Sequence, residues 1–266
     1  MRIPRHPGLQ LDVDGAVARL VLDRPEVLNA LSVELLDGIV EMCRFIDDHP
    51  EIRVVIVTGA GRTFSAGADL DTIQRLLQDG PDARHAADAG DRAASAIESL
   101  RAVTIASVHG RCVGGGVVLA LACDLRFAAA GARFSIPEID LGIPLAWGGV
   151  PRLLREVGPG VARDLILTGR EFGAGSALAN GVVSRVLADD RLDAEVAEVA
   201  AELTAKASLP VRATLDAIAA VTGAGTPQGW SDADTLLTAV RDPESRAVAA
   251  RYLGGLRGEP GTADQA

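Results

Sequence analysis

Three consecutive glycines, residues 114–116, directly precede an apolar segment with helical character, residues 117–122. Glycine loses more backbone entropy on folding than any other residue, so a run of three requires a local reason. One reason is a ligand that approaches the backbone closely where a helix begins, because free N–H groups there stabilise negative charge. The other is tight packing of the helix against a neighbouring strand. The glycines alone do not distinguish the two.

A second segment of small residues, 64–69 (FSAGAD), lies between a predicted strand and a predicted helix. A backbone N–H from this segment would complete a pair of donors of the kind that holds an oxyanion. A tight connection between two elements would use the same residues. Ser65 lacks the Gly-x-Ser-x-Gly surroundings of a hydrolase nucleophile, so we do not expect a serine hydrolase.

Glu138 is the carboxylate best placed for acid–base chemistry, because it stands between Pro137 and Ile139 in an otherwise apolar stretch. Partial loss of solvent raises the pKa of a carboxyl group toward the range in which it exchanges protons near neutral pH. The alternative is a surface glutamate where a strand meets a loop, which is more common for an isolated glutamate.

Composition excludes several classes of protein. The 266 residues are 48% hydrophobic, enough for one large or two small domains with a full core. The net charge of -10 argues against a nucleic-acid partner. Three cysteines and four scattered histidines show no metal-ligand spacing, and neither a P-loop nor a GxGxxG motif is present. With no signal peptide or membrane-spanning stretch in the sequence, we expect a cytoplasmic protein without a membrane or metal partner.

Hydrophobic periodicity predicts alternating strands and helices in the first half of the chain. A hairpin turn is expected at Asp14-Gly15, and Ser32 is the expected N-cap of a helix that ends near His49-Pro50. The predicted strands are residues 9–13, 17–22, 54–57, 104–108 and 124–128, and the further helices are 70–77, 86–100 and 117–122. Residues 78–84, which contain Gly80-Pro81, are predicted to form a mobile linker.

After Gly148 the pattern becomes mostly helical, with one predicted strand at residues 182–186. The predicted helices are residues 150–157, 161–168, 175–180, 192–205, 211–221 and 232–253. The fold class is therefore α/β, followed by a mostly helical C-terminal region.

Five motifs, in order between residues 9 and 257, resemble the enoyl-CoA hydratase/isomerase family, also called the crotonase superfamily. They are residues 22–31 (LDRPEVLNAL), 64–70 (FSAGADL), 110–116 (GRCVGGG) with 122–124 (ACD), 134–142 (FSIPEIDLG) with 148–153 (GGVPRL), and 167–170 (LTGR) with 177–183 (ALANGVV). The resemblance implies a spiral of ββα units over residues 1–200. It also implies a helical region, 201–266, that makes homotrimers or dimers of trimers.

The resemblance also implies a coenzyme A thioester as substrate, with no separate cofactor, because coenzyme A enters as part of that substrate. The backbone N–H groups of Ala68 and Gly115 would hold the thioester carbonyl, whose oxygen becomes negative as an enolate forms, and Glu138 would move the proton. The residues implied in substrate or coenzyme A binding are Glu26, Val27, Ala66, Asp69, Leu70, Gly114, Trp147 and Tyr252. Trp147 would line the acyl pocket or belong to the core, and Tyr252 would act from a helix of a neighbouring subunit.

One position departs from the family pattern. The family's hydratases use two glutamates, and Val118 stands where the first is expected. A single glutamate resembles the family's Δ3,Δ2-enoyl-CoA isomerases, and this is the leading prediction. The alternatives are a hydratase or lyase with a substitute carboxylate (Asp71, Asp140 or Glu98) and a non-catalytic acyl-CoA-binding protein. For Arg111, a surface salt bridge is expected over contact with an acidic acyl group.

Overall fold

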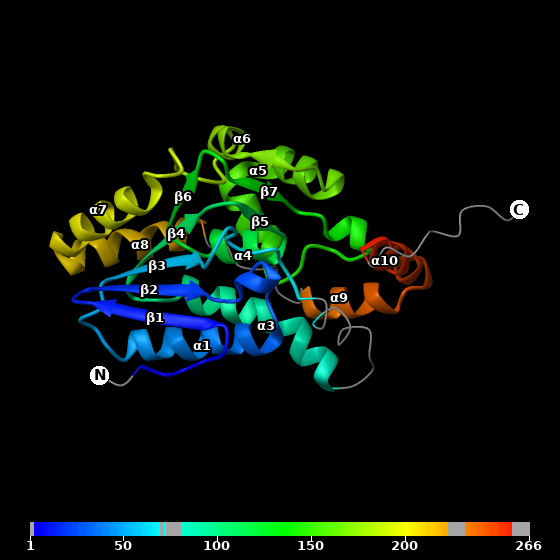
Figure 1. Cartoon of the computed structure of the whole chain (residues 1–266), viewed down its shortest axis with the longest axis horizontal. Coiled ribbons are helices and arrows are strands. Elements are labelled where there is room, and N and C mark those ends of the chain that lie inside the picture. Colours follow the sequence, from blue (N-terminus) through cyan, green and yellow to red (C-terminus); the bar gives the residue numbers. More distant parts are fainter. Residues whose placement is uncertain (1–2, 70–71, 73–80, 223–231, 257–266) are drawn as a thin grey trace, which may run out of the picture.

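Six strands form the central sheet of the computed structural model, which describes residues 3–69, 72, 81–222 and 232–256 (Figure 1). β1 (Leu9–Asp14) and β2 (Val17–Leu22) form the predicted antiparallel hairpin. The sheet continues with parallel pairing through β3 (Val54–Gly59), β4 (Val103–Val108), β6 (Leu125–Ala129) and β9 (Arg185–Leu187). The strand order is β1-β2-β3-β4-β6-β9.

The central strands are buried on both faces, and β3 shows how. Val55 and Val57 belong to one apolar cluster, which includes the buried side chains of α1 (Val33–Asp47) and α3 (Pro81–Glu98). Val54 and Ile56 point the other way into a second cluster with Val196 and other residues of α7 (Leu192–Ala205). Successive side chains of a strand face opposite sides, so helices on both faces explain the continuous apolar sequence of β3.

A second, three-stranded sheet contains β5 (Arg111–Val113), β7 (Arg133–Ser135) and β8 (Phe172–Gly173). β4 and β6 are neighbours in the first sheet, whereas β5 and β7, which follow them along the chain, are neighbours in the second. Each ββα turn thus adds one strand to each sheet, and this is the predicted spiral. The strands of the second sheet were not predicted, because two or three residues are too few to show a period.

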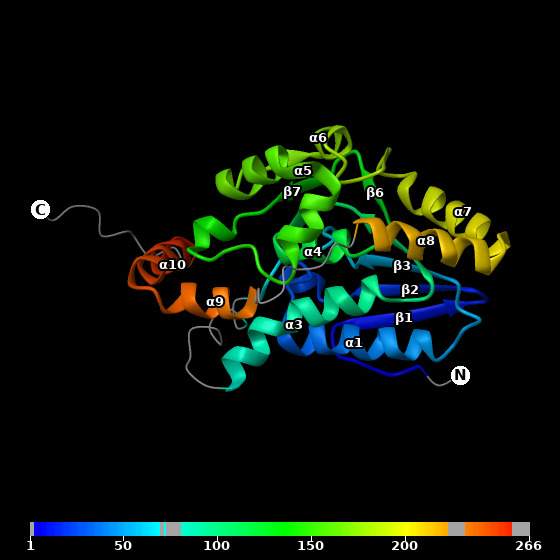
Figure 2. The same ribbon diagram turned by 180° about the vertical axis from the view of Figure 1, so that it is seen from behind.

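The remaining elements lie around these two sheets (Figures 1 and 2). α9 packs against α3, and α10 packs against the short helix η2. Within the described residues, no helix combines the length and apolar character needed to cross a bilayer. The bounds are η1 Pro25–Val27, α4 Gly115–Leu121, η2 Glu138–Leu141, α5 Gly149–Thr168, α6 Ala174–Ala179, α8 Ser208–Thr222, α9 Asp232–Arg241 and α10 Pro243–Leu256.

Prolines mark the boundaries of two predicted helical regions, one of which is corrected. The single helix expected over 232–253 is divided at Asp242, whose carboxylate accepts a hydrogen bond from the Ser245 N–H (2.9 Å) at the start of α10. Pro243 begins α10, because a first-turn residue needs no N–H partner. The two helices expected at 150–157 and 161–168 are confirmed, because a non-helical kink at Gly158 (φ 70°), just before Pro159, divides α5 between them.

The linker predicted at residues 78–84 is wrong for residues 81–84, which form the start of α3. Residues 78–80 and, apart from the helical Thr72, the helix predicted at 70–77 lie outside the described residues. The strand predicted at 182–186 is also displaced, because the N–H groups of Val182 and Val183 both donate to Ala177 at the end of α6.

Asn29 ties the turn after β2 to the loop after β3. It is buried and has a φ of +55°, a left-handed conformation that asparagine tolerates better than most residues. Its side-chain oxygen accepts from the Arg24 N–H (2.9 Å), and its amide donates to the carbonyls of Ala60 (2.8 Å) and Thr63 (2.7 Å). These bonds fix the start of segment 64–69.

Replacing Asn29 with alanine is therefore expected to lower the free energy of unfolding by about 2 to 4 kcal/mol, since buried groups lose their partners. Urea denaturation of the Asn29→Ala variant measures the loss. Asn180→Ala is the matched control, because the Asn180 amide makes one long bond, 3.3 Å, to Ser176. Equal losses in the two variants would contradict this role for Asn29.

Candidate active site

Segment 64–69 runs alongside β5. It follows β3 in the chain as β5 follows β4, so it takes the place of a strand in the preceding ββα unit. The Ser65 N–H donates to the Arg111 carbonyl (3.1 Å), and the Val113 N–H donates to the Ser65 carbonyl (3.0 Å). Ser65 and Cys112 form a parallel bridge, and from it the two segments continue toward Ala68 and Gly115. A Cβ added to Gly67 would lie 3.7 Å from the Gly115 nitrogen, which agrees with this register.

Ala68 and Gly115 each hold a backbone N–H with no acceptor among the described residues. On either side of Ala68, the Gly67 N–H donates to the Ser65 hydroxyl (3.1 Å) and the Asp69 N–H to the Leu31 carbonyl (3.0 Å). Unpaired N–H groups on adjacent segments are suited to bind one oxygen that carries or gains negative charge.

Ser65 holds the loop in place and is not disposed as a nucleophile. Its side chain is buried, and its hydroxyl donates to the Asn29 carbonyl (2.8 Å) while accepting from the Gly67 N–H. Both contacts maintain the turn that presents Ala68. This agrees with the absence of a hydrolase motif around Ser65.

The carboxyl group of Glu138 lies against the glycine run. Glu138 begins η2, shortly after β7, and β7 pairs in parallel with β5, so both glycines and glutamate follow neighbouring strands. The Gly114 N–H donates to the Ser135 carbonyl (2.9 Å) across this pair. A Cβ on Gly114 would overlap Oε1 of Glu138, and Gly114 also has a φ of +49°. Only glycine permits this close approach.

Burial changes the acidity of Glu138. The residue as a whole is half-buried, but its Oε2 atom is buried and has no hydrogen-bond partner among the described residues. Loss of solvent raises the pKa of the Glu138 carboxyl to about 7, and a hydrogen bond from its own backbone N–H opposes part of this rise. The group can therefore both accept and release a proton near neutral pH.

An apolar residue, Val118, occupies the position at which the family's hydratases carry their first glutamate. Val118 is buried one helical turn after Gly115, and a Cβ on Gly149 would lie 2.8 Å from both Val118 and Leu145. The proposed substitutes do not gather here within the described residues. Asp140 is exposed and faces Gly169, and Glu98 forms ion pairs with Arg152 (2.8 Å) and Arg155. Asp71 lies outside the described residues.

Trp147 is buried beside Gly115 in an unusual backbone conformation. Its φ is +58°, which is rare for a bulky residue and costs on the order of 1 to 3 kcal/mol. A Cβ on Gly115 would overlap the edge of the indole ring. The ring is therefore core-like in its burial and also in direct contact with a residue of the candidate site.

The residues expected around coenzyme A are placed as follows. Asp69 forms a salt bridge with Arg24 (2.7 Å), and the Ala66 N–H donates to the Leu28 carbonyl (2.9 Å), so both contacts join the loop to the segment around η1. Glu26 and Val27 are exposed on η1. Leu70 lies outside the described residues, and Tyr252 is on α10, where its side chain is not described.

The surface salt bridge expected for Arg111 is confirmed by its contact with Glu171 (3.3 Å), in which both side chains are exposed. Sequence reasoning assigned no role to Arg24, Asn29 or Arg152. Arg24 and Asn29 lie in the first quoted motif and Arg152 in the fourth. Their roles depend on partners far along the chain, which spacing does not reveal.

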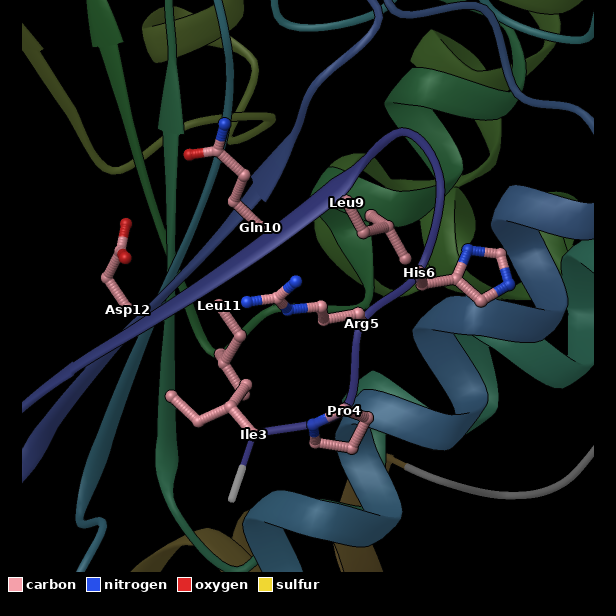
Figure 3. A pocket seen from close by; sticks show the side chains of 8 residues that line it. All are labelled: Ile3, Pro4, Arg5, His6, Leu9, Gln10, Leu11 and Asp12. Carbon is pink, nitrogen blue, oxygen red and sulfur yellow. The ribbon is translucent and has the colours of Figure 1, made fainter. Parts of the chain in front are cut away.

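A hollow of about 1080 Å³ lies elsewhere, along the N-terminal segment and β1 (Figure 3). The segment turns at His6 and returns as β1, and the side chains of Ile3 and Arg5 lie near that of Leu11. Its lining residues all belong to the range 3–12, so this hollow is separate from Glu138.

Because the pKa of Glu138 rises from 4.5 to about 7 on folding, its ionisation opposes the folded state. The folded protein binds the proton more tightly, so this group's contribution to stability is present below pH 4.5 and lost as the pH rises through 7. Each tenfold change in acidity corresponds to about 1.4 kcal/mol. The change in the free energy of unfolding caused by Glu138→Gln should therefore be more favourable to folding at pH 8 than at pH 4, by about 3 kcal/mol. Urea denaturation at both pH values measures this, and a pH-independent effect would contradict the buried carboxyl.

Comparison with known proteins identifies the family. The family model described as "Enoyl-CoA hydratase/isomerase" matches residues 12–250. Crotonyl-CoA hydratase from Syntrophomonas wolfei is 36% identical over 208 residues, 78% of this chain and 79% of the relative. A peroxisomal Delta(3,5)-Delta(2,4)-dienoyl-CoA isomerase from Arabidopsis thaliana is 35% identical over 217 residues, 77% of this chain and 78% of the relative.

The fold agrees with these relatives. The crystal structure of an enoyl-CoA hydratase from Mycobacterium avium subsp. paratuberculosis K-10 superimposes with a TM-score of 0.84 at 29% identity, covering 93% of this chain and 99% of that one. The predicted crotonase-like α/β fold is confirmed, and the chain belongs to the enoyl-CoA hydratase/isomerase family of acyl-CoA enzymes.

Proposed function

We propose that this enzyme catalyses Δ3,Δ2-enoyl-CoA isomerisation with Glu138 as its single acid–base group. The observation that carries the proposal is the Glu138 carboxyl, whose buried Oε2 has no hydrogen-bond partner among the described residues and whose Oε1 lies against Gly114, while Val118 stands at the position of the first glutamate. Water addition in this family relies on two carboxylates, whereas moving a double bond needs one group that removes a proton and returns it. A carboxyl with a pKa of about 7 suits both halves of that transfer.

The reaction follows from these positions. The thioester oxygen binds the N–H groups of Ala68 and Gly115, and the Glu138 carboxylate removes a proton from the α-carbon. The electrons of the broken C–H bond move into a dienolate, whose negative oxygen the two N–H groups stabilise. The protonated Glu138 then donates the same proton to the γ-carbon. The double bond moves into conjugation with the thioester, and the enzyme returns to its starting state.

Coenzyme A itself is proposed to lie along η1 and segment 64–69. Glu26 and Val27 are exposed there, and the bond between Ala66 and Leu28 keeps η1 beside the loop that presents Ala68. Gly114 and Trp147 border the reacting carbons, while Leu70 and Tyr252 are assigned to coenzyme A by family resemblance alone. A cytoplasmic location is part of the same proposal.

The assay supplies a 3-enoyl-CoA and a 2-enoyl-CoA to the purified protein and follows conjugation and water addition separately. We expect conjugation to exceed hydration, and Glu138→Gln to slow conjugation by about 100- to 10,000-fold. Glu171→Gln is the control, because Glu171 pairs with Arg111 and Arg133 on the surface. Fast hydration without migration would favour the hydratase or lyase. Tight acyl-CoA binding with equal turnover by wild type and Glu138→Gln would indicate a non-catalytic binding protein.

Residues 201–266 are proposed to join copies of the chain into a homotrimer or a dimer of trimers. Helix α8 has no buried residue, and three of its large apolar side chains are exposed: Leu209, Ile218 and Val221. A helix with an apolar surface of this kind gains stability when another surface covers it.

Light scattering should therefore report an oligomer for the wild type and a smaller species for the double variant Ile218→Asp with Val221→Asp. Ala219→Asp, at an exposed small residue of the same helix, should leave the mass unchanged. A wild-type monomer, or an oligomer that survives the double substitution, would contradict this interface.

A further inference from the structure

The indole of Trp147 is held between two glycines on different helices. A Cβ on Gly90 of α3 or on Gly115 of α4 would overlap the six-membered ring of the indole, and Cε3 is among the atoms that each of them would meet. Gly90 lies inside a helix, where glycine is less favourable than alanine, so the space it leaves has a structural use. The position of the indole ring thus depends on two residues that have no side chain, Gly90 and Gly115.

Arg152 fixes the backbone of Trp147. It is buried, and its guanidinium donates to the Trp147 carbonyl (2.9 Å). The same group donates to the Ser95 hydroxyl (3.0 Å) and to the carboxylates of Glu98 (2.8 Å) and Asp91 (3.3 Å), all on α3. A bulky residue with positive φ persists only when its surroundings determine it strongly, and these bonds meet that condition.

The indole and the Glu138 carboxyl flank the same short stretch of backbone. Gly114 faces the carboxyl and Gly115 faces the ring, and the Cα atoms of consecutive residues are about 3.8 Å apart. A chain bound with its thioester oxygen at Gly115 and its α-carbon at Glu138 therefore has the indole as its neighbour.

From this contact we propose that Trp147 determines acyl-chain specificity, as the wall that limits the enzyme to short acyl groups, with Arg152 as its positioning residue. The inference rests on the proposed acyl-CoA site and adds the class of acyl group. The close packing of the ring gives a longer chain no room without displacing a side chain held from two sides.

Calorimetric titration with saturated butyryl-, hexanoyl-, octanoyl- and dodecanoyl-coenzyme A tests this without depending on turnover. We expect wild-type affinity to fall from hexanoyl to dodecanoyl. Trp147→Leu should raise the ratio of octanoyl to butyryl affinity by at least about tenfold, because room for one further methylene group in a hydrophobic pocket has an effect of this size. Trp147→Phe, a smaller change, should raise the ratio less and guards against a variant that fails to fold.

Gly90→Ala perturbs the same contact in the opposite direction, since the added methyl pushes the ring toward the site. As a single substitution, Gly90→Ala should weaken the binding of hexanoyl-coenzyme A. Added to Trp147→Leu, it should have little further effect. Arg152→Met should raise the octanoyl-to-butyryl ratio as Trp147→Leu does, and Arg152→Lys should restore part of the wild-type ratio.

The outcomes separate this inference from the proposed reaction. An unchanged length ratio in folded Trp147→Leu and Trp147→Phe overturns the role of Trp147, even if isomerisation is observed. A shifted ratio without isomerisation supports the role and removes the proposed reaction. Failure of the wild type to bind any of the four thioesters overturns both.

Discussion

Pairing between successive turns of the spiral brings the candidate site together. Ser65 is opposite Cys112, and Cys112 is opposite Phe134, so three segments from distant parts of the sequence run parallel and in register. Three residues further along these segments are Ala68, Gly115 and Pro137, the residue before Glu138. Main-chain pairing, together with the side-chain bonds of Asn29 and Ser65, thus holds the segments that carry two free backbone donors and one carboxyl group, and a shift of one residue in either pairing would move these groups apart.

The chemistry of the site then depends on what fills the space around these three groups. Gly114 leaves room for the Glu138 carboxyl, while Val118, at the position of the family's first glutamate, packs near Gly149 and supplies no carboxylate. Burial raises the pKa of the Glu138 carboxyl to about 7, so its ionisation near neutral pH opposes the folded state. The strained backbone of Trp147 lies beside the same glycines. The ionisation of Glu138 and the positive φ of Trp147 therefore both lower the stability of the fold near the candidate site.

Much of this arrangement could be predicted from the sequence, and the failures have physical causes. The continuous apolar runs of the buried strands β3 and β4 and the helical period after Ser32 are clear in the sequence, and the five motifs indicated the family. β5, β7 and β8 are too short to have a period, yet they set the register of the site. The bonds of Asn29 to Ala60 and Thr63 cross about thirty residues of sequence, and the contacts of Arg152 with α3 cross more, so spacing could not reveal them.

The central claim is that Glu138 removes a proton from the α-carbon of a thioester whose oxygen is held by two backbone N–H groups. Proton–deuterium exchange at the α-carbon of butyryl-coenzyme A in D₂O, followed by NMR, measures that step without any change of double bond. The account predicts exchange catalysed by the wild type and abolished in Glu138→Gln. Wild-type exchange no faster than in buffer, or equally fast exchange by the variant, would contradict it.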